Sequence, residues 1–330
     1  MQEKIKISLP KATLELIEKD AVDFKFKKAD GSVNLNSFVN TLISNYYLDF
    51  SHREENFNRE LQRILESVPE RYREDAFMGV SHLVSHSGDY DYDKRNSTTF
   101  SFKPTKASSA AVRYIEHILL ESESLSSFYR RMFICYSKKA KNERELIIFK
   151  ETYEAICRQI EKGEELTIIL KNSAVYQHLS PFAVAGSRDE LFNYLLAYDG
   201  KTNRTIRLAQ IDTVLPLLSR ADIPEEFAAL FERQIECGVQ YPMYRTDREP
   251  IKVRLTDKGV DMFNRIYLYR PVPVSIEGDI YTFNCSRNQA LHYFQRFGSS
   301  ALIISPRKLG QDMRNFYSFA SRAYRKEYND

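Results

Sequence analysis

The chain has 330 residues and a formal net charge of only +3, from 48 basic and 45 acidic side chains. Its length predicts about two domains, and its charge is too balanced for a polyanion to bind anywhere except at a local basic patch. The four cysteines lack the spacing of a disulfide framework or a zinc site. Because we find no signal peptide and no apolar run of membrane length, we expect a cytoplasmic protein without a membrane partner.

The segment KIKISLP, from Lys4 to Pro10, alternates polar and apolar side chains, which is typical of a half-buried strand. Apolar spacing then predicts a helix after Pro10 and a second helix in NLNSFVNTLISNYY, with Asn36 as its N-cap. Two more helices are expected near residues 53–68 and 70–85. Strand, helix, turn and helix in this order resemble the ribbon-helix-helix fold, in which two chains normally contribute one strand each.

A second copy of the pattern predicts that this chain supplies its own partner. TTFSFKPT alternates like the first strand, and SLSSFYRRMFICYS aligns with NLNSFVNTLISNYY, keeping Ser37 with Ser127, Phe38 with Phe128 and Tyr46 with Tyr136. We therefore predict one ribbon-helix-helix domain over residues 1–137, with halves 1–50 and 97–137 and a helical insertion 51–96. Residues 4–9 should pair antiparallel with residues 99–103.

In the ribbon-helix-helix family the outward strand side chains enter the major groove of DNA. The resemblance therefore assigns this role to a ribbon face of Lys4, Lys6, Ser8 and Lys103, together with Thr99 and Ser101. A merely solvated strand face explains the same alternation. In the insertion, His82 and His86 have helical spacing for a metal pair, but no further ligand accompanies them. We predict neither a metal site nor a cofactor.

After a linker helix over residues 138–163, five short strand-like runs over 164–220 predict a small barrel. This stretch resembles the WYL domain, an Sm-like, SH3-like barrel. NYLLAYD keeps Tyr194 and Leu195 of the family's central strand, and RTIRLAQI keeps Arg204 and Arg207 of the next. Gln177 stands where the family often has arginine.

WYL domains sense ligands and single-stranded nucleic acid through arginines and aromatic residues on one barrel face. What the resemblance implies here is a binding site formed by Arg207, Arg204, Tyr194, His178, Gln177 and Arg188. Guanidinium groups suit phosphate, and tyrosine rings suit unpaired bases. Arg207 should point outward because it lies between Ile206 and Leu208, whereas Tyr194 fits the core equally well.

Residues 221–249 form a connector with a capped helix, and residues 250–330 follow the order βαββαβ with a terminal helix, which is ferredoxin-like. YFQRFGSSALIISPRKLGQDM resembles the WCX extension that follows many WYL domains and dimerises in that family. The resemblance therefore implies a homodimer through this region. The end of the chain is basic, which suits a surface facing phosphates.

These features predict an α+β multidomain protein with a ribbon-helix-helix pseudo-dimer, a WYL barrel and a ferredoxin-like C-terminal domain. No catalytic motif is evident, so we predict no enzyme and no catalytic residue. The combination resembles the WYL accessory proteins of type VI-D CRISPR systems, which implies single-stranded RNA and an RNA-guided effector nuclease as partners. Two alternatives remain: a DNA-binding WYL transcriptional regulator with duplex DNA as its partner, and a scaffold for protein contacts.

Overall fold

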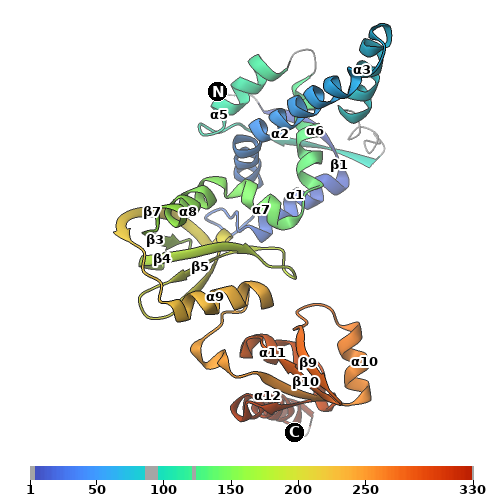
Figure 1. Ribbon diagram of the computed structural model, residues 1–330. Helices are drawn as coiled ribbons and strands as arrows, with labels where there is room; N and C mark the ends of the chain where they lie inside the picture. Colours follow the sequence, from blue (N-terminus) through green and yellow to red (C-terminus); the bar gives the residue numbers. More distant parts are fainter. Residues whose placement is uncertain (1–3, 86–95, 121–123, 329–330) are drawn as a thin grey trace. The chain divides into compact units, whose positions relative to one another are not determined.

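The computed structural model describes residues 4–85, 96–120 and 124–328 (Figure 1). The chain divides into two compact units, Met1–Lys150 and Glu151–Asp330. Both units combine helices with antiparallel strands, which confirms the α+β class. Within the described ranges, no helix has the length and apolar character needed to cross a bilayer.

In the first unit, β1 (Ile5–Pro10) and β2 (Ser97–Phe102) form a two-stranded antiparallel ribbon. Ile5 lies opposite Phe102, and the register continues to Pro10, so the expected pairing of two strands within one chain is confirmed. Ile7 is buried and Lys6 is exposed, as the alternation predicts. The ribbon therefore has an apolar inner face and a polar outer face.

Helices pack beneath the ribbon: α1 (Lys11–Asp23), α2 (Leu35–Leu65), α5 (Ser109–Tyr114) with a π-helical turn (Ile115–Leu119), and α6 (Leu125–Ser137). α3 (Glu70–Ser85) and α7 (Lys141–Ile148) both contact α2. The aromatic core under the ribbon includes the buried rings of Phe38, Phe102, Phe128 and Tyr129.

The second helix differs from its prediction in two ways. α2 is one continuous helix, whereas two were expected, and its N-cap is Asn34, which accepts a hydrogen bond from the Ser37 amide at 3.1 Å. The prediction of Asn36 as the cap was wrong because its side chain is used elsewhere. Asn36 accepts from the Lys103 amide at 2.8 Å and donates to the Lys103 carbonyl at 3.2 Å, which ties α2 to the end of β2.

Two hydrogen bonds tie corresponding positions of α2 and α6 to the two strands of the ribbon. Lys6 lies opposite Ser101, so a rotation that exchanges the strands about this pair places Ser8 where Lys103 lies. The Arg130 guanidinium donates to the Ser8 carbonyl at 2.9 Å, and Asn40 donates to the Lys103 carbonyl at 3.1 Å. Asn40 and Arg130 occupy matching positions in the alignment of the two helices. Each donates a hydrogen bond to a backbone carbonyl in one ribbon strand or directly after it.

A buried ion pair links three helices of the same unit. The Arg144 guanidinium on α7 grips Asp20 on α1 through two hydrogen bonds of 2.6 and 2.9 Å, and Asp20 is only 1% exposed. The Tyr136 hydroxyl on α6 donates to the same carboxylate at 2.8 Å. Arg144 also donates to the Lys139 carbonyl at 2.6 Å. The hydrogen bonds to the Asp20 carboxylate described above therefore come from residues more than a hundred positions away.

The linker segment contains two helices instead of the expected single one. α7 ends before Phe149, and α8 (Lys150–Lys162) begins after it. Phe149 leaves the helical conformation, and its ring packs edge-on against Phe24 at 6.1 Å. The packing of this aromatic side chain accompanies the break in the helix.

In the second unit, α8 is followed by a five-stranded antiparallel sheet of order β6-β5-β4-β3-β7. Its strands are β3 (Glu164–Leu170), β4 (Val175–Gly186), β5 (Asn193–Tyr198), β6 (Asn203–Arg207) and β7 (Ile211–Arg220). Helix α9 (Glu225–Cys237) packs on one face, where Phe231 stacks on Phe182 and Phe227 lies 4.5 Å from Tyr198.

A separate core forms the rest of this unit. Its strands are β8 (Ile251–Leu255), β9 (Pro273–Glu277), β10 (Ile280–Phe283) and β11 (Ala301–Ser305), in the sheet order β11-β8-β10-β9. Helices α10 (Asp257–Arg265), α11 (Arg287–Phe294) and α12 (Arg307–Tyr328) complete it. The predicted order of strands and helices in this region is confirmed.

Candidate nucleic-acid interface

The outer face of the ribbon carries the cationic side chains that the sequence assigns to it. Lys4, Lys6 and Lys103 are exposed, and Ser8 is half-buried. Among the described residues, none of these lysines forms an ion pair with a carboxylate. Thr99 and Ser101 are also exposed on this face. A surface of unpaired ammonium groups and hydroxyls offers hydrogen-bond donors to phosphate without first having to break a salt bridge.

A hollow of about 400 Å³ adjoins this face. Lys4 and Lys6 line it together with Arg113 on α5 and the first turn of α6, where Leu125 and Ser126 lie. Glu116 also lines it, so it is not purely cationic. The cationic surface therefore continues from the ribbon toward α5.

Arg207 lies at the end of β6, directly across from Tyr194 on β5. Arg207 is half-buried and shares a face of the sheet with Thr205, two residues earlier, which accepts a hydrogen bond from Gln234 of α9 at 2.8 Å. The face of β6 that carries Arg207 is therefore the one on which α9 packs. The Arg207 guanidinium lies 3.2 Å from the centre of the Phe192 ring. Tyr194 donates to Glu190 and packs against the cluster under α9.

Arg204 points to the opposite face of β6. It forms an ion pair with Asp199 at 2.6 Å and lies 5.4 Å from the centre of the Tyr176 ring. Although burial raises the pKa of Asp199, hydrogen bonds from Thr202, Arg204 and Lys201 lower it below its usual value. Phosphate binding by Arg204 would have to compete with this carboxylate.

The other predicted barrel residues lie elsewhere. His178 bonds through Nδ1 to Glu165 at 2.9 Å, and Ser219 donates to the same carboxylate at 2.6 Å. These two bonds, Ser219 first, lower the pKa of Glu165 despite its partial burial. Gln177 is exposed on β4, and Arg188 is exposed in the loop that also carries Glu190 and Phe192.

The structure thus brings Arg207 and Tyr194 together beside the loop of Arg188, and it separates them from Arg204. Sequence reasoning missed the partners Phe192, Asp199 and Glu165, because nothing local marks which acidic or aromatic residue meets a given cation. His86 and the side chain of His82 lie outside the described residues. In the described segments, no group of three or more potential ligands is placed to hold a metal ion.

Comparisons with known proteins show similarity at the level of fold. No family model matches the chain, and no curated protein sequence matches it. A solved structure described as a CRISPR Cas-related protein is similar over 99% of this chain and 95% of its own, with a TM-score of 0.66 and 19% sequence identity. Proteasome accessory factor B/C of Arthrobacter aurescens matches 69% of this chain and 39% of its own at 16% identity, but its TM-score of 0.25 is too low to support an argument.

Proposed function

We propose that this protein binds single-stranded RNA and acts as an accessory protein that modulates an RNA-guided CRISPR nuclease. The observation that carries the proposal is the set of exposed lysines on the outer ribbon face, which have no carboxylate partner among the described residues. The similarity in fold to a CRISPR Cas-related protein across nearly the whole chain supports the CRISPR accessory role. The proposal gives the chain a binding role and no catalytic one.

The finer fold assignments belong to this proposal. The two-stranded ribbon with its helices is consistent with a ribbon-helix-helix pseudo-dimer, and the five-stranded sheet is consistent with a WYL barrel of the Sm-like, SH3-like kind. The strand order β11-β8-β10-β9 is consistent with a ferredoxin-like WCX domain. We also propose a contribution from the barrel residues Arg207, Arg204 and Tyr194, but binding there requires Arg204 to leave Asp199.

Removing the ribbon lysines tests the proposal. The triple change Lys4→Ala, Lys6→Ala and Lys103→Ala should weaken binding of labelled single-stranded RNA by about ten- to a hundredfold at low salt. It should also lower the salt slope by roughly two units, because each phosphate contact on a single strand contributes about 0.7. Fluorescence anisotropy at several salt concentrations measures both quantities.

The matched control removes the same charge from the exposed residues Lys19, Lys201 and Lys258 and should leave binding nearly unchanged. The variant Arg207→Ala tests in the same assay whether the barrel contributes to RNA binding. If the ribbon variant binds RNA as the wild type does while Arg207→Ala loses binding, the barrel is the contact surface and the ribbon assignment fails. If the wild type binds no single-stranded RNA, the proposed function is wrong.

A DNA-binding transcriptional regulator is the second candidate, because the major groove of DNA admits a two-stranded ribbon. The rotation that exchanges the strands matches Lys4 with Thr99, Lys6 with Ser101, and Ser8 with Lys103, so the two strands present different side chains. A palindromic operator mirrors a symmetric protein, and this ribbon is unequal. Tighter binding of duplex DNA than of RNA in the same assay would favour the regulator.

We further propose that the protein forms a homodimer through α12. Leu309 and Met313 are buried in the C-terminal core, but the same helix face continues to Tyr324 and Tyr328, which are 68% and 77% exposed. A second copy would cover this aromatic face. Tyr324→Asp should weaken the dimer at least tenfold in sedimentation equilibrium, because it places a charge in an apolar contact.

The control for the dimer is Leu218→Asp on β7, where the wild-type side chain is 92% exposed. This variant should sediment as the wild type does. A dimer of unchanged affinity in the Tyr324→Asp variant would exclude this face as the interface.

A further inference from the structure

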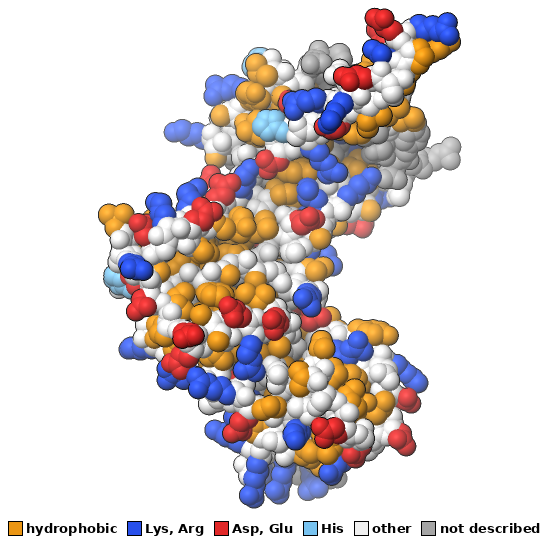
Figure 2. Space-filling view, viewed as in Figure 1, with side chains coloured by type: hydrophobic (Ala, Val, Ile, Leu, Met, Phe, Trp, Pro, Cys, Tyr) orange, Lys and Arg blue, Asp and Glu red, His pale blue; other side chains and the backbone are white. Residues whose placement is uncertain are grey.

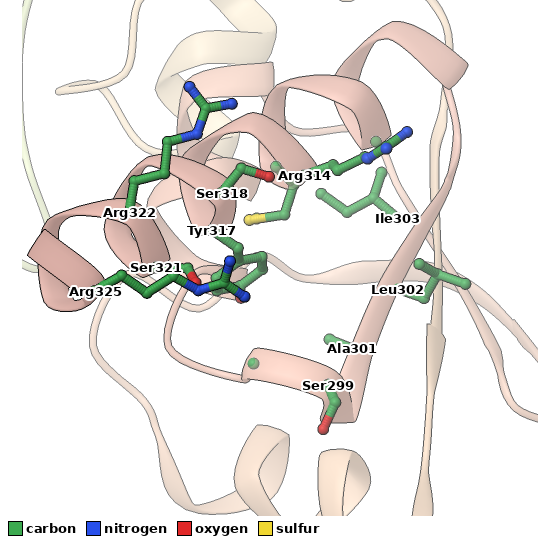
Figure 3. A pocket seen from close by; sticks show the side chains of 13 residues that line it. Ser299, Ala301, Leu302, Ile303, Arg314, Tyr317, Ser318, Ser321, Arg322 and Arg325 are labelled. Atoms are coloured by element: carbon green, nitrogen blue, oxygen red, sulfur yellow. The ribbon is translucent and has the colours of Figure 1, made fainter. Parts of the chain in front are cut away.

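A groove separates α12 from β11 at the edge of the C-terminal sheet. It has a volume of about 690 Å³, and we call it the α12 groove (Figure 3). Ala301, Leu302 and Ile303 of β11 form one wall, and α12 forms the other with Arg314, Tyr317, Ser318, Ser321, Arg322 and Arg325. Because β11 is an edge strand, the groove lies at the border of the sheet.

The contact between β11 and the first turn of α12 closes one end of this groove. A Cβ atom on Gly310 would lie only 2.7 Å from the Ile303 carbonyl oxygen, so the helix and strand are in close contact there. Further along, Tyr317 turns its hydroxyl inward and donates to the Gln295 carbonyl at 3.1 Å, which fixes its ring in the floor. The groove therefore has a rigid, partly apolar floor.

The rim of the groove carries arginine side chains that form no ion pair within the described chain. Arg314, Arg322 and Arg325 are exposed, and none has an ion pair to a carboxylate of the described chain. With 100° per residue, these arginines share one face of α12 with Ser318 and Ser321. The acidic residues Asp312 and Glu327 fall on the opposite face. Figure 2 shows Lys and Arg side chains gathered over this part of the C-terminal domain.

The length of the rim restricts the ligand. Arg314 and Arg325 are eleven residues apart, which corresponds to about 16 Å along a helix. A single phosphate group cannot reach all three arginines, whereas successive phosphates along a strand can. Guanidinium groups and serine hydroxyls are donors that suit phosphate oxygens.

We propose that the α12 groove holds the sugar-phosphate backbone of a single RNA strand, independently of its sequence. This inference rests on the RNA binding proposed above and adds a second contact surface to it. The arginines supply the charge, the serines supply neutral donors, and the closed end at Gly310 defines where the strand can enter. The groove extends the bound length of RNA beyond what the ribbon contacts.

The test compares two triple variants of the full chain. Arg314→Ala, Arg322→Ala and Arg325→Ala together should weaken binding of single-stranded RNA by about ten- to a hundredfold and lower the salt slope by about two units. The effect should be equal for RNAs of different sequence. The control changes Arg63, Arg158 and Arg248 to alanine. Each of these exposed arginines already pairs with a glutamate, so the control should leave affinity and slope nearly unchanged.

The outcomes separate this inference from the proposed function. If the wild type binds RNA and the groove variant binds it with the same affinity and the same salt slope, the groove assignment is wrong. The proposed function would still stand. No RNA binding by the wild type would overturn both. If the groove variant keeps its RNA affinity but loses binding of poly-L-glutamate, the groove serves an acidic protein segment and the RNA assignment is wrong. Circular dichroism verifies that both variants are folded, which is expected because the changed side chains are exposed.

Discussion

Replacing Asp20 with alanine is expected to lower the free energy of unfolding by about 3 to 5 kcal/mol, the largest effect of any single change considered for this protein. The reason is that the Arg144 side chain is only 10% exposed and forms two of its hydrogen bonds with this carboxylate. Without Asp20, a guanidinium stays buried with no counter-charge. The Tyr136 hydroxyl, for which burial raises the pKa, loses its acceptor as well. Urea denaturation followed by circular dichroism measures the loss.

Two further variants test the physical explanation. Asp49→Ala removes an ion pair with Lys150 in the same unit, in which the side chains are 51% and 36% exposed, so it should cost less than about 1 kcal/mol. The double change Asp20→Leu with Arg144→Met removes both charges and should recover much of the stability lost in Asp20→Ala. A loss for Asp20→Ala no larger than that for Asp49→Ala would show that the buried pair contributes little.

Gly259→Ala is expected to lower the free energy of unfolding of the second unit by about 1 to 3 kcal/mol. A Cβ atom at this position of α10 would overlap the Ser300 carbonyl oxygen and lie 3.3 Å from the Leu255 Cβ. That carbonyl is held in place because it accepts a hydrogen bond from the Thr256 amide at 3.1 Å. The added methyl group must therefore push the start of α10 away from the segment that leads into β11.

Gly79→Ala is the matched control, since it also lies inside a helix but has no atom within 4 Å of the added Cβ. Alanine there should raise stability by up to about 1 kcal/mol, because it lowers the entropy of the unfolded chain and favours the helix. Thermal melting of both variants measures the contrast. Equal melting temperatures would mean that the α10 contact relaxes at no cost.

Local periodicity was sufficient to predict much of the secondary structure of this protein. The alternation of Lys4 to Leu9 predicted a strand with Ile7 inside, and the second alternating segment predicted its partner. In the C-terminal third, the order of strands and helices was also predictable. These predictions succeeded because burial of one face repeats every two residues in a strand and every three to four in a helix, so the signal lies within a short window.

Other features were decided only by tertiary structure. Asn34 caps α2 because Asn36 is bonded to Lys103, and the linker breaks at Phe149, whose ring packs on Phe24. In the candidate site, the sequence identified Arg204 and Arg207 as cations in neighbouring positions. Their spacing of three residues already places them on opposite faces of a strand, and only the fold gave each a separate partner.

The sequence by itself therefore determined which side chains lie on a common strand or helix face, including the lysines of the ribbon and the arginines of α12. Tertiary structure alone decided which cations of the chain are neutralised, as Arg144 is by Asp20, and which are exposed with no carboxylate partner among the described residues, as Arg314 is. The physical reason is that an ion pair depends on a few ångströms between two side chains. For Asp20 and Arg144 that distance joins residues 124 positions apart, and no periodic pattern along the chain encodes it.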